Sequence, residues 1–115
     1  MSIKVHTREV GGITVLDLNG KITLGEGGPI LRDAVRAQIS QGSQKILLNL
    51  ADVTYIDSAG LGELTSAFTS MKNRNGQLKL LNLTKRVHDL LQITKLYTVF
   101  DVYDDEREAI GSFAP

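Results

Sequence analysis

Residues 45–62 read KILLNLADVTYIDSAGLG, and their character changes twice along the segment. The first part, residues 45–50, is short and dense in apolar residues, which is typical of a strand covered on both faces. Residues 51–57 are more polar and are expected to form a loop. From Ser58 onward, apolar residues recur at helical spacing until Asn75-Gly76, which predicts an amphipathic helix. A strand, a loop and a helix in succession are the repeating unit of an α/β fold.

Two runs of alternating apolar and polar residues precede this unit, at residues 4–10 and 13–22. Gly11-Gly12 separates them, and two glycines can supply the positive φ angles of a two-residue hairpin turn. We therefore expect the chain to open with an antiparallel hairpin.

Helical spacing also returns between the hairpin and residue 45. Pro29 fits the first position of a helix whose apolar residues continue to Ile39, and Gly42 fits its left-handed C-terminal cap. The elements expected after the second helix are a strand at 78–83, a helix capped by Thr84, a short strand at 98–103 and a terminal helix that starts at Asp104-Asp105-Glu106. The order ββαβαβαβα, with right-handed crossovers, predicts a mostly parallel sheet with an N-terminal hairpin.

Length and composition argue against several classes of protein, namely multidomain, nucleic-acid-binding and membrane proteins. The 115 residues contain no linker and no internal repeat, so residues 1–115 are expected to form one domain. Lys+Arg 13 balance Asp+Glu 13, and this zero net charge gives no overall field for nucleic acid or an anionic membrane. Apolar runs are far shorter than the ~20 residues of a membrane span, and the first residues lack the apolar core of a signal peptide. We expect a cytoplasmic protein that neither enters a membrane nor binds nucleic acid directly.

Several kinds of chemical site lack their usual residues. Cysteine is absent, and His6 and His88 lie far apart in the sequence, so no metal site is expected. The glycines at 25–28 lack the Lys-Ser/Thr ending of a phosphate-binding loop and do not match G-x-G-x-x-G. No base lies near Ser58 in the sequence, so no nucleophile and base pair is apparent. We therefore expect no catalytic residue and no cofactor.

One segment is placed where function usually lies in open α/β sheets, just beyond the C-terminal end of a parallel strand. It reads Asp57-Ser58-Ala59-Gly60-Leu61-Gly62. Ser58 would lie at the positive end of a helix dipole, which tolerates a phosphate. Gly60 and Gly62 would let another surface approach the backbone, and Ala59 and Leu61 would offer apolar contact. The segment is a candidate contact or modification site; the alternative is that Asp57 or Ser58 only caps the helix and Gly60 eases a tight turn.

This segment resembles the D-S-[ST]-G-[LV]-G signature of STAS domains, in particular of the bacterial anti-sigma-factor antagonists. The resemblance extends over essentially the whole chain, through the hairpin and residues 18–22, 46–53 and 80–83. It implies a STAS domain over residues 1–115, with helices packed on one side of the sheet. It also implies a regulator, not an enzyme, whose phosphorylated serine is Ser58.

The resemblance further implies two kinds of partner. An anti-sigma factor that is also a serine kinase, with the ATPase fold of histidine kinases, would bind the unphosphorylated chain and release its sigma factor. Phosphorylation of Ser58 would add about −1.5 to −2 charges and end that binding, and a serine phosphatase would restore it. The surface expected to meet the partner is centred on Asp57, Ser58, Ala59, Gly60, Leu61 and Gly62, with rim contacts from Thr23, Gly25 and Tyr55.

Three positions depart from the family pattern. Ala59 replaces a frequent second hydroxyl residue, and Lys21 and Thr23 stand where many antagonists have the acidic residues of G-E-[LIV]-D. These departures keep open a STAS subunit of a lipid-transport or stress-signalling assembly in which Ser58 is not phosphorylated. A small-ligand or nucleotide-binding domain that uses the glycines at 25–28 and 58–62 is a further alternative.

Overall fold

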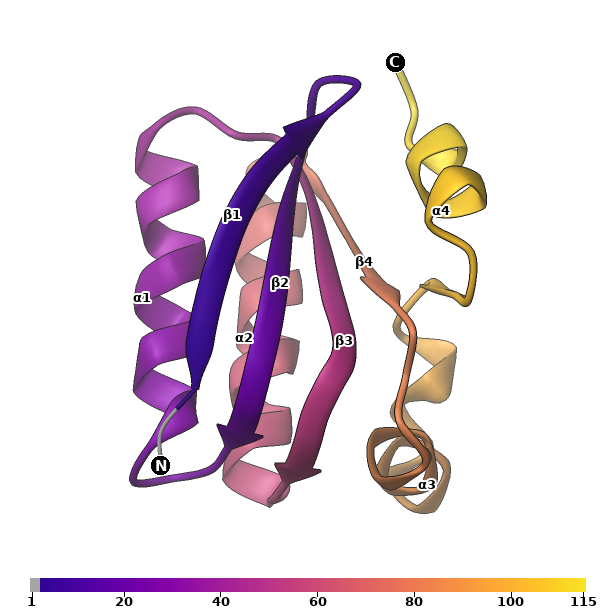
Figure 1. Ribbon diagram of the computed structural model, residues 1–115. Helices are drawn as coiled ribbons and strands as arrows, with labels where there is room; N and C mark the ends of the chain where they lie inside the picture. The colour runs from indigo at the N-terminus through magenta and orange to yellow at the C-terminus, as the bar shows by residue number, and fades with distance from the viewer. Residues whose placement is uncertain (1–2) are drawn as a thin grey trace.

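The computed structural model describes residues 3–115 as a five-stranded sheet with helices on both faces (Figure 1). The strands follow one another across the sheet in chain order. They are β1 (Lys4–Val10), β2 (Ile13–Ile22), β3 (Lys45–Ile56), β4 (Gln77–Leu81) and β5 (Val102–Tyr103). β1 and β2 are antiparallel, and every later pair is parallel. The predicted fold class, with its hairpin and mostly parallel sheet, is confirmed.

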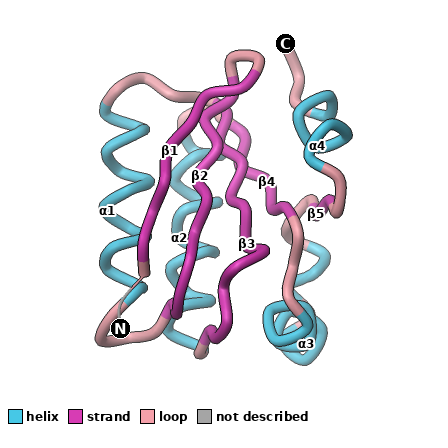
Figure 2. Tube along the Cα trace, viewed as in Figure 1, coloured by secondary structure: helices cyan, strands magenta, loops and turns pink. Residues whose placement is uncertain are grey.

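The helices and their order also agree with the prediction (Figure 2). They are α1 (Gly27–Ser40), α2 (Ser58–Asn73), α3 (Lys85–Thr94) and α4 (Glu106–Ser112), with a short 3₁₀ helix at Leu96–Thr98. α1, α2 and α3 share one face of the sheet, because each connects two parallel strands and all three crossovers step in the same direction. α4 differs from the expectation of helices on one side. It follows the last strand, so no crossover constrains it, and it packs on the opposite face.

Alternation along the strands produces two apolar cores. On β2, Leu16 and Leu18 face the large core beneath α1, α2 and α3, whereas Ile13 and Val15 face the smaller core beneath α4. On β3, Leu48 and Leu47 divide in the same way. Successive side chains of a strand point to opposite faces, so a strand that is apolar at every position has both faces covered.

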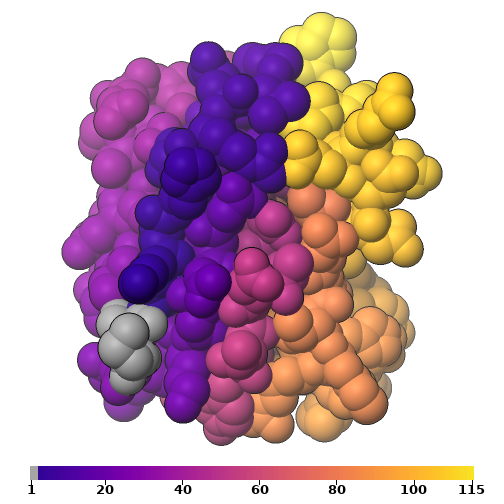
Figure 3. Space-filling view, viewed as in Figure 1, coloured from indigo at the N-terminus to yellow at the C-terminus, as the bar shows by residue number. Residues whose placement is uncertain are grey.

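An ion-pair cluster joins α4 to the hairpin. The Arg8 guanidinium on β1 lies 2.7 Å from the Asp17 carboxylate on β2 and 2.6 Å from the Glu106 carboxylate on α4. The Asn49 side chain on β3 donates a further hydrogen bond to Asp17 at 2.8 Å. Figure 3 shows the result, with α4 in yellow lying beside the indigo hairpin on this face of the molecule.

The glycines at the turns adopt the backbone conformations that the sequence predicts. Gly11 and Gly12 have φ of 58° and 82°, as the hairpin requires. Gly42 has φ of 89°, and the N–H of Ser43 donates to the Gln38 carbonyl at 3.0 Å, which closes α1 as predicted. Pro29 is not the first helical residue, because α1 begins two residues earlier at Gly27.

Two predicted boundaries are wrong. Residues 51–56 belong to β3 and are not a loop; they pair with the end of β2, and Val53 and Ile56 are fully buried. The pairing of β2 with β3 shifts after Asp17 and again after Gly20. These shifts interrupt the alternation of buried and exposed side chains in the second half of β3, so its sequence does not read as a strand. In the segment 98–103, only the last two residues form a strand, since Phe100 turns into the large core and packs edge-on against Phe68 at 5.4 Å.

Candidate functional site

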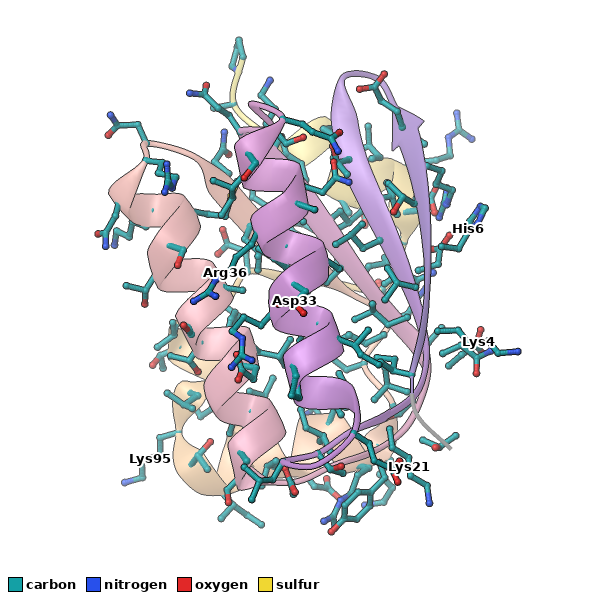
Figure 4. All side chains as sticks on the ribbon, turned by 90° about the vertical axis from the view of Figure 1, so that its left-hand side faces the viewer. Lys4, His6, Lys21, Asp33, Arg36 and Lys95 are labelled. Atoms are coloured by element: carbon teal, nitrogen blue, oxygen red, sulfur yellow. The ribbon has the colours of Figure 1, made fainter. Side chains whose placement is uncertain are left out.

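The candidate site lies where β2 and β3 end and α1 and α2 begin, at the lower edge of Figure 1. Figure 4 places Lys21, near the end of β2, at the same edge. Two backbone hydrogen bonds hold the segments together. The Asp57 N–H donates to the Ile22 carbonyl at 3.3 Å, and the Gly28 N–H donates to the Thr23 carbonyl at 2.9 Å. The start of each helix is therefore fixed at the end of β2, on its last residue Ile22 and on Thr23, which follows it.

The Asp57 carboxylate is the N-cap of α2. Its Oδ1 accepts a hydrogen bond from the Gly60 N–H at 2.8 Å, and its Oδ2 accepts one from the Leu24 N–H at 3.3 Å. One side chain thus caps α2 and also holds the loop that leads into α1. Of the two capping candidates, Asp57 has the role.

Ser58 is left without a capping task. It is the first residue of α2 and is exposed, and its hydroxyl has no hydrogen-bond partner within residues 3–115. It lies at the positive end of the helix dipole, beside the Asp57 carboxylate. The serine hydroxyl is accessible and sits where an added phosphate is compatible with the helix.

Gly60 and Gly62 lie in different surroundings. A Cβ atom on Gly60 would overlap the carbonyl oxygen of Ile22, so the lack of a side chain lets α2 approach β2. Gly60 is buried in this contact and offers no surface to another molecule. A Cβ atom on Gly62 would meet nothing within 4 Å, and Gly62 is exposed.

Leu61 does not provide the apolar contact expected of it. Its side chain is 4% exposed and belongs to the large core. Ala59 is partly exposed and remains available for contact. The predicted segment therefore divides into outward residues, Ser58 and Gly62 above all, and residues that hold α2 in place.

The rim residues lie around the same edge. Gly25 is exposed and Thr23 is partly exposed, in the loop between β2 and α1. Tyr55 lies on β3, not in a loop; it is 39% exposed, and its ring faces the Arg86 guanidinium of α3 at 4.4 Å. This cation–π contact connects the start of α3 to the site.

Leu24 is the site residue that the sequence reasoning missed. Its side chain is 76% exposed, and its N–H is the group bound by Asp57. An exposed leucine in the loop that Asp57 holds is a candidate for the apolar contact expected of Leu61. The available signal was a lone leucine within the polar turn Thr23-Leu24-Gly25-Glu26.

The described residues form neither a metal-binding cluster nor a membrane-spanning helix. Residues 3–115 contain no group of three or more His, Asp or Glu side chains placed to hold a metal ion. His6 lies on β1 and His88 on α3. None of the helices described is both long enough and apolar enough to cross a membrane.

Comparisons with known proteins agree with this geometry. The family model described as STAS domain matches residues 4–109. The chain is 32% identical over 102 residues to the anti-sigma-B factor antagonist of Bacillus subtilis, an alignment that covers 89% of this chain and 92% of the relative.

Solved structures share the fold. The crystal structure of an anti-sigma factor antagonist from Mycobacterium paratuberculosis superposes with a TM-score of 0.86 at 19% identity, covering 97% of this chain and 94% of that one. The structure of the Bacillus cell fate determinant SpoIIAA in its phosphorylated form gives a TM-score of 0.72 at 22% identity, covering 94% and 97%.

Proposed function

This chain belongs to the STAS domain family, and from that premise we propose that it is an anti-sigma-factor antagonist switched by phosphorylation of Ser58. Its unphosphorylated form binds an anti-sigma factor that is also a serine kinase, and the sigma factor is released. Phosphorylation ends this binding, and a serine phosphatase renews it. The name of the Bacillus subtilis relative supports the regulatory role.

One observation carries the proposal: the exposed Ser58 hydroxyl has no structural task, because Asp57 already caps the helix. A hydroxyl without a role in the fold can be modified without unfolding the domain. In the transfer step, the Ser58 oxygen would bond to the γ-phosphorus of ATP held by the kinase. The bond to the β-phosphate oxygen would break, ADP would leave, and the serine proton would pass to a base of the kinase.

The charge of the phosphate supplies the switch. It adds about −1.5 to −2 charges beside the Asp57 carboxylate. Free N–H groups and the dipole of α2 partly compensate for this charge within the domain, so the fold is retained. A partner that covers Ser58 would have to remove water from the same charge, which strongly disfavours the complex.

Leu24 is the apolar part of the proposed partner surface. Its backbone N–H is held by Asp57, the residue before Ser58, and its side chain is 76% exposed; Tyr55 adds a ring that is 39% exposed at the same edge. Burying an exposed leucine side chain at the centre of an interface is worth about 1.5–3 kcal/mol. We place Leu24 at that centre, together with Ser58, Ala59 and Gly62, and with Thr23, Gly25 and Tyr55 at the rim.

The test is a pull-down from native lysate with Ser58→Ala and Ser58→Asp proteins as paired baits. The alanine bait should capture an ATPase of the anti-sigma kinase type, and the aspartate bait should not. Ser40→Asp is the matched control, since Ser40 is exposed at the opposite end of α1 and receives the same charge. It should bind as the wild type does.

A different result would support the other role that the sequence leaves open. If both Ser58 baits bring down the same membrane-transport or stress-signalling subunits, the phosphorylation switch is refuted. The domain would then be a STAS subunit of such an assembly.

A further inference from the structure

A groove between α1 and α2 collects charge and hydroxyl groups that the proposed function does not use. Arg32 and Arg36 line it from α1, and Glu63, Ser66 and Ser70 line it from α2. Ser66 follows Ser58 by two helical turns, which places it about 12 Å further along α2. Ser66 and Ser70 also line the shallow hollow that reaches Ser58, so it is the two arginines of α1 that set the groove apart from the Ser58 surface.

Arg32 is only partly satisfied in this groove. Its Nη1 donates to the Glu63 carboxylate at 3.1 Å, which ties α1 to α2. Its Nε is buried and has no hydrogen-bond partner among the described residues. The Nε edge of a guanidinium is one that can hold an oxyanion through two parallel hydrogen bonds, and here that edge is unused.

Arg36 lies one turn further along α1 and is exposed. Figure 4 shows its side chain in the space between α1 and α2. Within residues 3–115 it makes no ion pair, and no ion pair joins Asp33, the one acidic residue of α1, to either arginine. Two like charges four residues apart destabilise a helix, and here only Arg32 has an acidic partner, so the second positive charge suggests a missing anion.

The two serines complete the set of donors. Ser66 is exposed, Ser70 is partly exposed, and neither hydroxyl has a hydrogen-bond partner in the described part of the chain. Glu63 supplies one negative charge against the two arginines, which leaves the groove with a net positive charge. Planar guanidinium groups with hydroxyl donors beside them are the combination that recognises phosphate oxygens.

We propose that the groove between α1 and α2 binds a phosphate-type oxyanion, held by Arg32 and Arg36 with hydroxyl hydrogen bonds from Ser66 and Ser70. Binding requires a small turn of Arg32 that exposes its Nε edge and leaves the Glu63 pair in place. The oxyanion is either free phosphate or the phosphate group of a small metabolite. The proposal does not depend on phosphorylation of Ser58.

The test is a titration of the wild-type chain with inorganic phosphate at constant ionic strength, followed by NMR. The readouts are the backbone amides of Ser66 and Ser70 and the side-chain Nε–H signals of the arginines. We expect saturable shifts at these groups and binding weaker by about tenfold or more in Arg36→Gln, which loses a charged donor. Ser66→Ala should weaken binding less, while its unfolding midpoint stays at the wild-type value.

Arg107→Gln is the matched control, because Arg107 is an exposed arginine on α4, on the other face of the sheet. It should bind phosphate as the wild type does. Equal loss in Arg36→Gln and Arg107→Gln, or shifts that never saturate, would show a general ionic effect and overturn the proposal. A parallel titration with adenosine monophosphate separates the two sources: tighter binding than inorganic phosphate indicates a metabolite, and equal or weaker binding indicates the free anion.

Discussion

The backbone of Gly60 packs directly against the carbonyl group of Ile22, so that any side chain at position 60 would overlap the carbonyl oxygen. This contact sets the first turn of α2 on the end of β2. Because Ser58 lies two residues before Gly60, the same contact determines where its hydroxyl emerges. Gly60, which the sequence suggested as part of a contact surface, instead lies buried beneath that surface and lets α2 approach β2.

Gly60→Ala should destabilise the domain by about 1–3 kcal/mol, the usual cost of forcing extra atoms into a packed site. Urea denaturation measures the change. Gly62→Ala is the matched control, since its Cβ atom would meet nothing within 4 Å. Alanine there should raise the free energy of unfolding by about 0.5–1 kcal/mol, because it replaces a helical glycine. Equal effects at the two positions would contradict the packing role of Gly60.

Leu24→Ser should leave the stability within about 0.5 kcal/mol of the wild type, since exposed side chains contribute little to the core. It should weaken binding of the anti-sigma factor by about tenfold or more, as loss of a central apolar contact does. Surface plasmon resonance with the captured partner measures this change. Ile93→Ser is the control, because Ile93 is 80% exposed on α3 and the change removes an equally exposed apolar side chain from another element. A similar loss of affinity in both variants would exclude a specific role for Leu24.

Asp57→Ala should cost about 1 kcal/mol of stability, because α2 loses its capping carboxylate. The Leu24 N–H should lose its partner at the same time and exchange with solvent faster. Asp57→Asn keeps an oxygen that can accept the Gly60 N–H, so it should retain most of the stability. Hydrogen exchange at Leu24 and urea denaturation together test both roles. Unchanged exchange at Leu24 in Asp57→Ala would show that the loop is held by other contacts.

The Arg8 cluster should make stability depend on pH in the acid range. Hydrogen bonds from Arg8 hold the pKa of Asp17 and the pKa of Glu106 below their ordinary values. A carboxyl group with a lowered pKa in the folded state stabilises the fold above the pKa it has when unfolded. That contribution is lost as the pH falls through the folded-state value. The wild type should therefore lose stability progressively below about pH 4.

Arg8→Met removes the largest cause of both lowered pKa values. Its melting temperature should be lower than that of the wild type at neutral pH and should fall less steeply below about pH 4. Arg107→Met, which changes a cation of α4 outside this cluster, should follow the wild-type curve. Parallel curves for Arg8→Met and the wild type would refute the assignment.

Local patterns predicted the order of the fold. The glycines of the hairpin, the cap at Gly42 and the apolar spacing of α2 each act over a few residues, so the sequence alone reveals them. The second half of β3 lacked such a signal, because the shifted pairing with β2 leaves Val53 and Ile56 three residues apart instead of two. The side of the sheet chosen by α4 was also hidden, since it depends on an apolar patch assembled from several strands.

The sequence predicted where the candidate site lies, but not which of its residues face the solvent and which hold α2 in place. The sequence showed that residues 57–62 follow a strand and start a helix. Whether Leu61 faced the solvent or the core depended on how α2 lies on the sheet, which no local pattern encodes. Leu24 became part of the site only through the hydrogen bond from its N–H to Asp57, which lies 33 positions further along the chain.

The strands lie across the sheet in the same order as along the chain, and this order affects how the domain folds. Each strand after the first pairs with the strand that precedes it, so each pairing closes only the connection between two consecutive strands. The edge that carries Ser58 is built from β2, α1, β3 and α2, which are consecutive, so it needs only residues 13–73. The contact between Arg8 and Glu106 joins the earliest strand to the final helix and is among the last to close. The edge that carries Ser58 therefore rests on contacts between consecutive elements, whereas the contact that holds α4 joins residues at the two ends of the described chain.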